Sequence, residues 1–185
     1  MEPEPPQRLR RRTRRLDPPA GTPAGRQRLS AADDRTVSQG QIQQGSPADF
    51  DRLLVVWEEA VRATHDFLDE ADIDSLRRLV RDHALPAVDL RVYCDGQGVI
   101  QGFAGTDGDR LEMLFVSNAV RGTGIGRQLV EQAIIELGIR HVDVNEQNPQ
   151  ALGFYRHLGF EQVGRSPLDG QGRPFPLLHL RVVEA

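Results

Sequence analysis

A glycine-rich turn between a strand-like run and an amphipathic segment is the feature that most constrains the fold of this chain. The stretch VSNAVRGTGIGRQLVEQAI covers residues 116–134, and three glycines occupy the five positions directly after Arg121. The run Arg110–Val116 before it predicts a strand. A helix is predicted over residues 124–137, because apolar residues follow at helical spacing: Ile125, Leu129, Val130, Ala133, Ile134 and Leu137.

The start of that helix is suited to bind an anion. The first N–H groups of a helix have no intrahelical acceptor, and the helix dipole places about half a positive charge there. Glycines let the backbone approach a phosphate closely, and Arg121 adds a permanent positive charge. The loop GTGIGR lacks both the Lys-Ser/Thr pair of a Walker P-loop and the dinucleotide-binding spacing. From these residues alone, a phosphate cradle and a merely tight turn both remain open.

The other segments predict an α+β or mixed α/β domain. Ser46, Pro47 and Asp49 have the positions of a helix start before an apolar helical face that begins at Phe50. A second helix, about 73–83, is expected to end before Pro86. A helix separates the fourth and fifth strands, so the central sheet must be partly parallel. Further strands are predicted over 36–44, 88–94, 99–105, 139–144, 160–165 and 175–183, and a further helix over 148–158.

Residues 1–35 differ in composition from the rest of the chain. They hold nine Arg against five acidic residues, a net charge of +4, whereas the rest holds 14 Arg against 22 acidic residues, a net charge of −8. The segment is rich in Pro, Arg and Gly and has no hydrophobic period, so we expect a disordered extension before a folded domain over 36–185. Nucleic acid would be bound only through this tail, which has no aromatic residue for base stacking.

Several other classes of protein are not expected. No apolar run approaches the roughly 18 residues of a membrane span, so we expect no membrane partner. Cys94 is the only cysteine, which rules out an internal disulfide and favours the cytoplasm. The histidines are scattered without ligand spacing, so no metal site is expected. Monomer and homodimer both remain open.

The glycine loop and its flanks resemble the GNAT superfamily of N-acetyltransferases. RGTGIG at residues 121–126 matches that family's Arg/Gln-x-x-Gly-x-Gly/Ala motif. LEMLFVSNAVRGTGIGRQLVEQAI and VNEQNPQALGFYRHLGFEQVGRS are similar to its fourth strand, loop and third helix and to the strand, helix and strand that follow. ATHDFL, VNEQN and PLLHL are similar to the bacterial YjaB-like branch. The resemblance covers about residues 42–183. It implies a mostly antiparallel sheet of about seven strands with four helices, splayed between strands four and five.

This resemblance implies an acetyl-CoA site in the splayed cleft. The pantetheine arm would lie along Leu114, Phe115 and Val116. Asn148 would start the following helix, as an N-cap, and would also contact the cofactor. Tyr155 would protonate the departing thiolate; a packing role in an aromatic patch is the alternative. The pyrophosphate would rest on the loop residues Arg121, Gly122, Thr123, Gly124, Ile125, Gly126 and Arg127.

The implied activity is acetyl transfer from acetyl-CoA to a primary amine of unidentified identity, by direct attack on the thioester. A base or a water relay helps, because a free amine with a pKa near 10 is mostly charged at pH 7. Three candidates are Glu112, expected on the same strand face as Leu114, Asp143 on the next strand, and His65 in the loop between the first two helices. The alternative function is a catalytically weak acyl-CoA-binding sensor or partner module.

Overall fold

The computed structural model describes residues 40–64, 69–170 and 172–183. The chain divides into two units, Met1–Arg35 and Thr36–Ala185, and every described residue belongs to the second unit. The predicted N-terminal extension and the candidate base His65 therefore lie outside the described residues.

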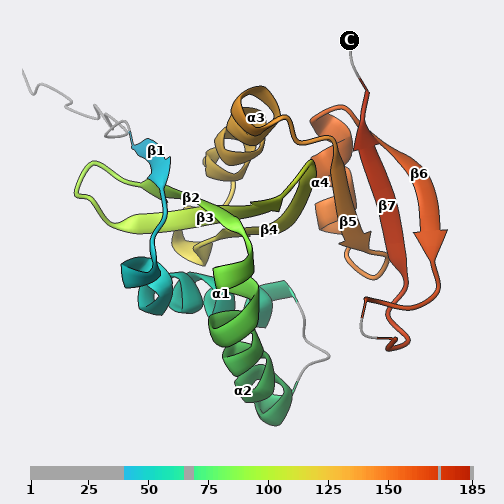
Figure 1. Ribbon diagram of the computed structural model, residues 1–185, viewed down its shortest axis with the longest axis horizontal. Coiled ribbons are helices and arrows are strands. Elements are labelled where there is room, and N and C mark those ends of the chain that lie inside the picture. Colours follow the sequence, from blue (N-terminus) through green and yellow to red (C-terminus); the bar gives the residue numbers. More distant parts are fainter. Residues whose placement is uncertain (1–39, 65–68, 171, 184–185) are drawn as a thin grey trace, which may run out of the picture. The chain divides into compact units, whose positions relative to one another are not determined.

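A seven-stranded mixed sheet forms the centre of the domain (Figure 1). Its strand order is β1-β2-β3-β4-β5-β7-β6. Neighbouring strands are antiparallel except β4 and β5, which are parallel as predicted from the helix between them. The strands are β1 (Gln41–Gln44), β2 (Asp89–Cys94), β3 (Ile100–Asp107), β4 (Arg110–Val116), β5 (His141–Asn145), β6 (Phe160–Ser166) and β7 (Leu177–Val182).

Four α-helices accompany the sheet, as the resemblance implied. In Figure 1, α1 and α2 lie on one side of β2–β4 and α3 lies on the other, while α4 lies beside β5. The helices are α1 (Phe50–Thr64), α2 (Glu70–Leu79), α3 (Ile125–Leu137) and α4 (Pro149–His157). This mixed α/β arrangement confirms the predicted fold class.

The start of α1 is fixed by residues that the sequence singled out. Asp49 Oδ2 accepts hydrogen bonds from the backbone N–H of Ser46 at 2.8 Å and from its hydroxyl at 2.9 Å. This reciprocal arrangement satisfies donors that the helix itself leaves unpaired. Pro47 begins a short 3₁₀ turn, Pro47–Asp49, that leads directly into α1. The predicted helix start is therefore confirmed.

The second helical segment is longer than predicted at both ends. It begins at Glu70, where Asp69 Oδ1 accepts from the N–H of Asp72 at 2.8 Å. After α2 it continues through a π-helical turn, Val80–Ala84, and a 3₁₀ turn, Leu85–Ala87. The α-helical and π-helical part therefore ends at Ala84, before Pro86 as expected, and Pro86 lies in the separate 3₁₀ turn. Proline is tolerated at the first positions of a helical turn, because no intrahelical hydrogen bond is lost there.

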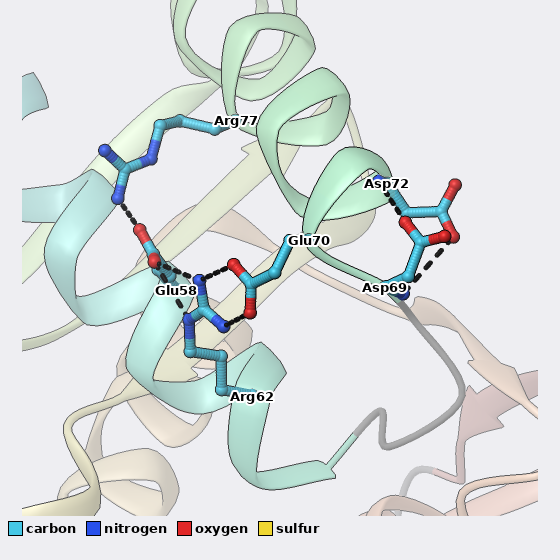
Figure 2. Close-up of polar contacts among 6 residues, drawn as sticks. All are labelled: Glu58, Arg62, Asp69, Glu70, Asp72 and Arg77. Carbon is cyan, nitrogen blue, oxygen red and sulfur yellow. Dashed lines mark hydrogen bonds and ion pairs between the residues drawn. The ribbon is translucent and has the colours of Figure 1, made fainter.

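Ion pairs join α1 and α2 on either side of the loop between them (Figure 2). Arg62 donates two hydrogen bonds to the Glu70 carboxylate, at 2.7 and 2.8 Å. Glu58 accepts from Arg62 at 2.9 Å and also pairs with Arg77. The Arg62 hydrogen bond holds the pKa of the exposed Glu70 carboxyl below its usual range. These contacts link the helices that flank the loop in which His65 lies.

The sheet separates two apolar cores. One lies between α1, α2 and strands β2–β4, and its buried residues include Leu53, Trp57 and Phe103. The other lies on the α3 and α4 side and includes Leu129 and Phe160. Among the described residues, no side chain of β5, β6 or β7 belongs to the first core. The β5–β7–β6 half of the sheet is thus packed on its α3 and α4 side. Its opposite surface, together with the adjoining end of β4 at Arg110 and Glu112, is here called the open face.

Strands β4 and β5 separate soon after they pair. Only Arg110 and Leu111 of β4 are in register with β5, opposite His141 and Val142. The rest of β4 pairs with β3 alone. The predicted splay between the fourth and fifth strands is confirmed, and it begins next to Glu112 and Asp143.

Candidate active site

A cavity of about 480 Å³ lies between the separated part of β4, the glycine loop and α4. The glycine loop is defined here as residues 121–127. All the residues predicted to bind the cofactor line this cavity except Thr123. Additional lining residues are Ala60, Val120, Gln150, Ala151, Phe154, His157 and Leu158, of which none was named as a candidate from the sequence.

The glycine loop leaves the start of α3 without a side-chain cap. Gly122 and Gly124 have φ angles of +78° and +92°, a region that side-chain-bearing residues rarely adopt. No side chain caps α3, and the N–H groups of Ile125, Gly126 and Arg127 have no acceptor among the described residues. Unpaired N–H groups and the positive end of the helix dipole therefore meet at the cavity wall. This is the arrangement that binds phosphate groups.

The loop's other side chains are oriented by neighbouring residues. Arg121 donates to Gln150 of α4 at 3.3 Å, across the cavity mouth, and Arg127 pairs with Glu131 at 2.7 Å. The Thr123 hydroxyl donates to the Val120 carbonyl at 2.7 Å. Thr123 thus shapes the turn, whereas the two arginines remain exposed beside the cavity.

Asn148 begins α4, as predicted. Its Oδ1 accepts from the N–H of Ala151 at 2.9 Å, and Pro149 occupies the first helical position. This cap uses the oxygen of the side-chain amide, so its NH₂ group is available as a donor in the cavity that Asn148 lines. Both roles expected for Asn148 are geometrically compatible.

Tyr155 lies on α4 between the aromatic core and the cavity. Its ring makes edge-to-face contacts with Phe154 and Phe160, with centroids 5.1 and 5.5 Å apart. Only 7% of Tyr155 is exposed, and its hydroxyl makes no hydrogen bond to any residue that the structure describes. Burial raises the pKa of this phenol well above its ordinary value of about 10. The residue therefore packs in the core and presents a neutral donor to the cavity that it lines.

Glu112 does not share a strand face with Leu114, and that expectation is wrong. A β-bulge pairs Gly105 with Met113 but Thr106 with Leu111, so Glu112 has no partner on β3. Leu111 and Leu114 pack in the same core although they are three residues apart, which strict alternation would not allow. Glu112 instead accepts from Arg110 on the opposite face of the sheet at 3.2 Å.

Asp143 lies on the same open face as Glu112. Its neighbours Val142 and Val144 are buried on the α3 and α4 side, so the Asp143 side chain points the other way. Arg110 joins the two candidate bases, since it also donates to Asp143 at 2.6 Å. The structure thus brings Glu112 and Asp143 together where β4 and β5 separate, on the face of the sheet opposite α3, and neither of them lines the cavity.

His179 and Ser166 adjoin this pair, and neither was chosen from the sequence. His179 Nδ1 lies 2.7 Å from Asp143 Oδ1, and Ser166 Oγ lies 2.7 Å from His179 Nε2. The alternation of PLLHL could have placed His179 on the polar face of its strand. Its contact with Asp143 could not be read from the sequence, because it depends on the β5–β7 register.

Within the described ranges, no three His, Cys, Asp or Glu side chains gather as a metal site. None of the helices described is both long and apolar enough to cross a membrane.

Comparisons with known proteins agree with this geometry. A family model for the acetyltransferase (GNAT) domain matches residues 58–175. The chain is 43% identical over 130 residues to the peptidyl-lysine N-acetyltransferase YjaB of Salmonella typhimurium, covering 70% of this chain and 89% of that protein. It is 42% identical over 135 residues to YjaB of Escherichia coli, covering 73% and 91%.

A solved structure shares this fold. The solution structure of apo YjaB from Escherichia coli superimposes with a TM-score of 0.72 at 38% identity, covering 80% of this chain and 99% of that one. The family match covers the strand, glycine loop and helix that build the cavity, and the relatives extend it over most of the domain. The chain therefore belongs to the GNAT family and is an N-acetyltransferase with YjaB among its homologues.

Proposed function

We propose that this chain transfers an acetyl group from acetyl-CoA to a primary amine, with acetyl-CoA bound in the cavity beside the glycine loop. The uncapped start of α3 at one end of this cavity carries the proposal, because it offers unpaired N–H groups to a pyrophosphate. GNAT acetyltransferases use acetyl-CoA as donor. The YjaB relatives are peptidyl-lysine N-acetyltransferases, so a lysine side chain in a peptide is the first acceptor to test.

Different residues around the cavity would bind different parts of acetyl-CoA. The loop amides of residues 121–127 would bind the pyrophosphate, while Arg121 and Arg127 would add positive charge. The pantetheine arm would lie along Leu114–Val116, the part of β4 that β5 leaves unpaired. Asn148 would donate from its side-chain NH₂ group.

Tyr155 would stabilise the departing thiolate. A thiol has a pKa near 8.5, and burial raises the pKa of Tyr155 above 10, so complete proton transfer from the phenol would be unfavourable. A hydrogen bond from the neutral hydroxyl to the developing charge costs no such transfer. We therefore assign to Tyr155 the role of hydrogen-bond donor to the leaving group.

The acceptor would attack the thioester directly, without a covalent enzyme intermediate. Glu112 and Asp143 are candidate proton acceptors, because they lie where β4 and β5 separate. His65 remains a third candidate. Action in the cytoplasm remains a prediction, with which the free, buried Cys94 is compatible.

The proposal is tested by thermal unfolding of the full chain with and without acetyl-CoA. Donor at about 100 times its dissociation constant should add roughly 2.7 kcal/mol of stability. Gly124→Asp should abolish this shift, because it strains the backbone at φ +92° and places a carboxylate where the pyrophosphate would lie. Gly98→Asp is the matched control: its φ of +79° carries similar strain in the turn between β2 and β3, away from the cavity.

Thiol release with lysine-bearing peptides then distinguishes an active acetyltransferase from the alternative, a catalytically weak acyl-CoA-binding sensor. A protein that binds acetyl-CoA but releases no thiol with any amine would be the sensor. If millimolar acetyl-CoA leaves the unfolding midpoint of the parent chain unchanged, the proposed cofactor site and the proposed function are both wrong.

A further inference from the structure

A hydrogen-bonded junction joins α1 to the end of β4, directly before the glycine loop. The Ser117 hydroxyl donates to Glu59 Oε2 at 2.7 Å, and the side-chain amide of Asn118 donates to the backbone carbonyl of Glu59 at 2.6 Å. One residue of α1 thus accepts from two consecutive residues of the segment that leads into the loop. These three residues form the α1–β4 junction, and the residue after Glu59, Ala60, lines the cavity.

The Ser117 hydroxyl depends on Glu59 for its hydrogen bond. Met113 and Phe115 pack in the core on the α1 side, and Ser117 follows them at the alternating spacing of a strand, so its side chain points toward α1. Only 4% of Ser117 is exposed, and its hydroxyl does not cap the short turn that begins at the next residue. A buried donor without an acceptor costs free energy. Loss of the Glu59 carboxylate would therefore favour a shift of Ser117.

The 3₁₀ turn that follows β4 transmits the position of this junction to the glycine loop. The N–H of Val120 donates to the Ser117 carbonyl at 3.1 Å, and the N–H of Arg121 donates to the Asn118 carbonyl at 3.4 Å. The Thr123 hydroxyl then donates to the Val120 carbonyl at 2.7 Å. A continuous set of hydrogen bonds therefore connects α1 to the loop whose N–H groups face the cavity.

The junction requires an acceptor oxygen at Glu59 rather than a negative charge. Within the described residues, Glu59 has no arginine partner, unlike its neighbour Glu58. The amide oxygen of a glutamine can accept the same hydrogen bond from Ser117. Glu59→Gln therefore keeps the junction and removes only the charge.

We infer that Glu59 is a positioning residue for the donor site; this rests on the proposed binding of acetyl-CoA beside the glycine loop. Glu59 acts through Ser117 and Asn118, which hold the entry of the loop where the N–H groups at the start of α3 can meet the pyrophosphate. Without the Glu59 side chain, the loop would populate other positions as well. The apparent affinity for acetyl-CoA falls with the fraction of molecules whose loop is correctly placed.

The test is calorimetric titration of the full chain with acetyl-CoA, beside urea unfolding without ligand. Glu59→Ala should raise the dissociation constant about tenfold, whereas Glu59→Gln should stay within about twofold of the parent chain. Thiol release with a lysine-bearing peptide should show a raised KM for acetyl-CoA and a nearly unchanged kcat in Glu59→Ala, as expected when binding alone is lost. Ser117→Ala should also weaken binding. The double variant should bind no more weakly than Glu59→Ala, because both changes remove the same contact.

Glu58→Ala is the matched control. Glu58 is the preceding residue of the same helix, but its carboxylate pairs with Arg77 and so ties α1 to α2 (Figure 2). This variant should lower the urea midpoint without changing the acetyl-CoA dissociation constant.

Two results would overturn the positioning role alone. The first is a Glu59→Ala chain that loses stability but binds acetyl-CoA as the parent does, and the second is equally weakened binding in Glu58→Ala. If Glu59→Ala does not fold, parent affinity in Ser117→Ala would overturn the inference instead. A parent chain that does not bind acetyl-CoA would overturn the proposed function, and the inference with it.

Discussion

The two faces of the sheet build their polar sites in different ways. On the α3 and α4 side, the glycine loop is one continuous segment in which Gly122 and Gly124 take positive φ angles and α3 begins uncapped. On the open face, a chain of polar contacts takes single residues from β4, β5, β6 and β7. A site built from one continuous segment can be predicted from a sequence motif. A site built by the register of several strands can be recognised only in the folded structure.

The comparison also separates two kinds of chemistry. Backbone N–H groups and a helix dipole on the α3 side suit a phosphate-bearing donor. Side chains that can exchange protons lie on the open face, next to the opening between β4 and β5. We therefore expect changes in the glycine loop to alter donor affinity, and changes at Tyr155 or on the open face to alter the rate.

Tyr155→Phe should have the largest effect, and this effect should fall on the rate rather than on donor binding. We expect kcat to fall about 10²-fold, because a donor to the developing thiolate is lost. The acetyl-CoA dissociation constant and the stability should change little, since the hydroxyl bonds to none of the described residues. Steady-state kinetics and calorimetric titration measure both, with buried Tyr93→Phe on β2 as control. A kcat equal to the parent's would leave Tyr155 as a packing residue.

Gly126→Ala should raise the stability of the chain and lower its affinity for acetyl-CoA. Gly126 is inside α3, where alanine is preferred by about 0.5–1 kcal/mol, and a Cβ would meet Phe154 at an ordinary 3.5 Å. The methyl group would narrow the cavity that Gly126 lines, so we expect roughly tenfold weaker acetyl-CoA binding. Urea unfolding and calorimetric titration measure the two effects. Unchanged affinity would place the donor away from this wall.

Gly164→Ala should have a smaller effect, confined to the open face. The new Cβ would press on the His179 ring by a few tenths of an ångström. We expect kcat to fall about threefold at neutral pH, because the contact between the His179 ring and the candidate proton acceptor Asp143 would be disturbed. The acetyl-CoA dissociation constant is the internal control. A changed acetyl-CoA dissociation constant with an unchanged kcat would contradict the separate roles of the two faces.

Glu70→Gln should have the smallest effect, on stability alone. The hydrogen bond from Arg62 lowers the pKa of Glu70 in the folded chain below its value in the unfolded chain, so the pair stabilises the fold at neutral pH. This contribution is lost as the pH falls through the lowered pKa. Urea midpoints of parent and variant should therefore differ slightly at neutral pH and converge in acid. A difference that persists in acid would show that packing, rather than charge, links α1 and α2.

The sequence predicted the fold and the donor side of the site, where local signals dominate. Ser46 and Asp49, the glycine loop, and Asn148 before Pro149 each act through neighbours only a few residues away. Glu112 was placed on the wrong face because one bulge residue reverses the alternation beyond it. His179 was missed because its partners Asp143 and Ser166 are 36 and 13 residues away in the chain.

The division between the faces is tested most directly by backbone NMR spectra recorded as acetyl-CoA is added to the full chain. The account predicts chemical-shift changes at residues 114–116, 121–127 and 148–155, with the amides of Gly124, Ile125 and Gly126 among the largest. Amides near His179 and Ser166 should move little until an amine acceptor is added. Changes centred on β6 and β7 with donor alone, or a glycine loop that does not respond, would contradict the account.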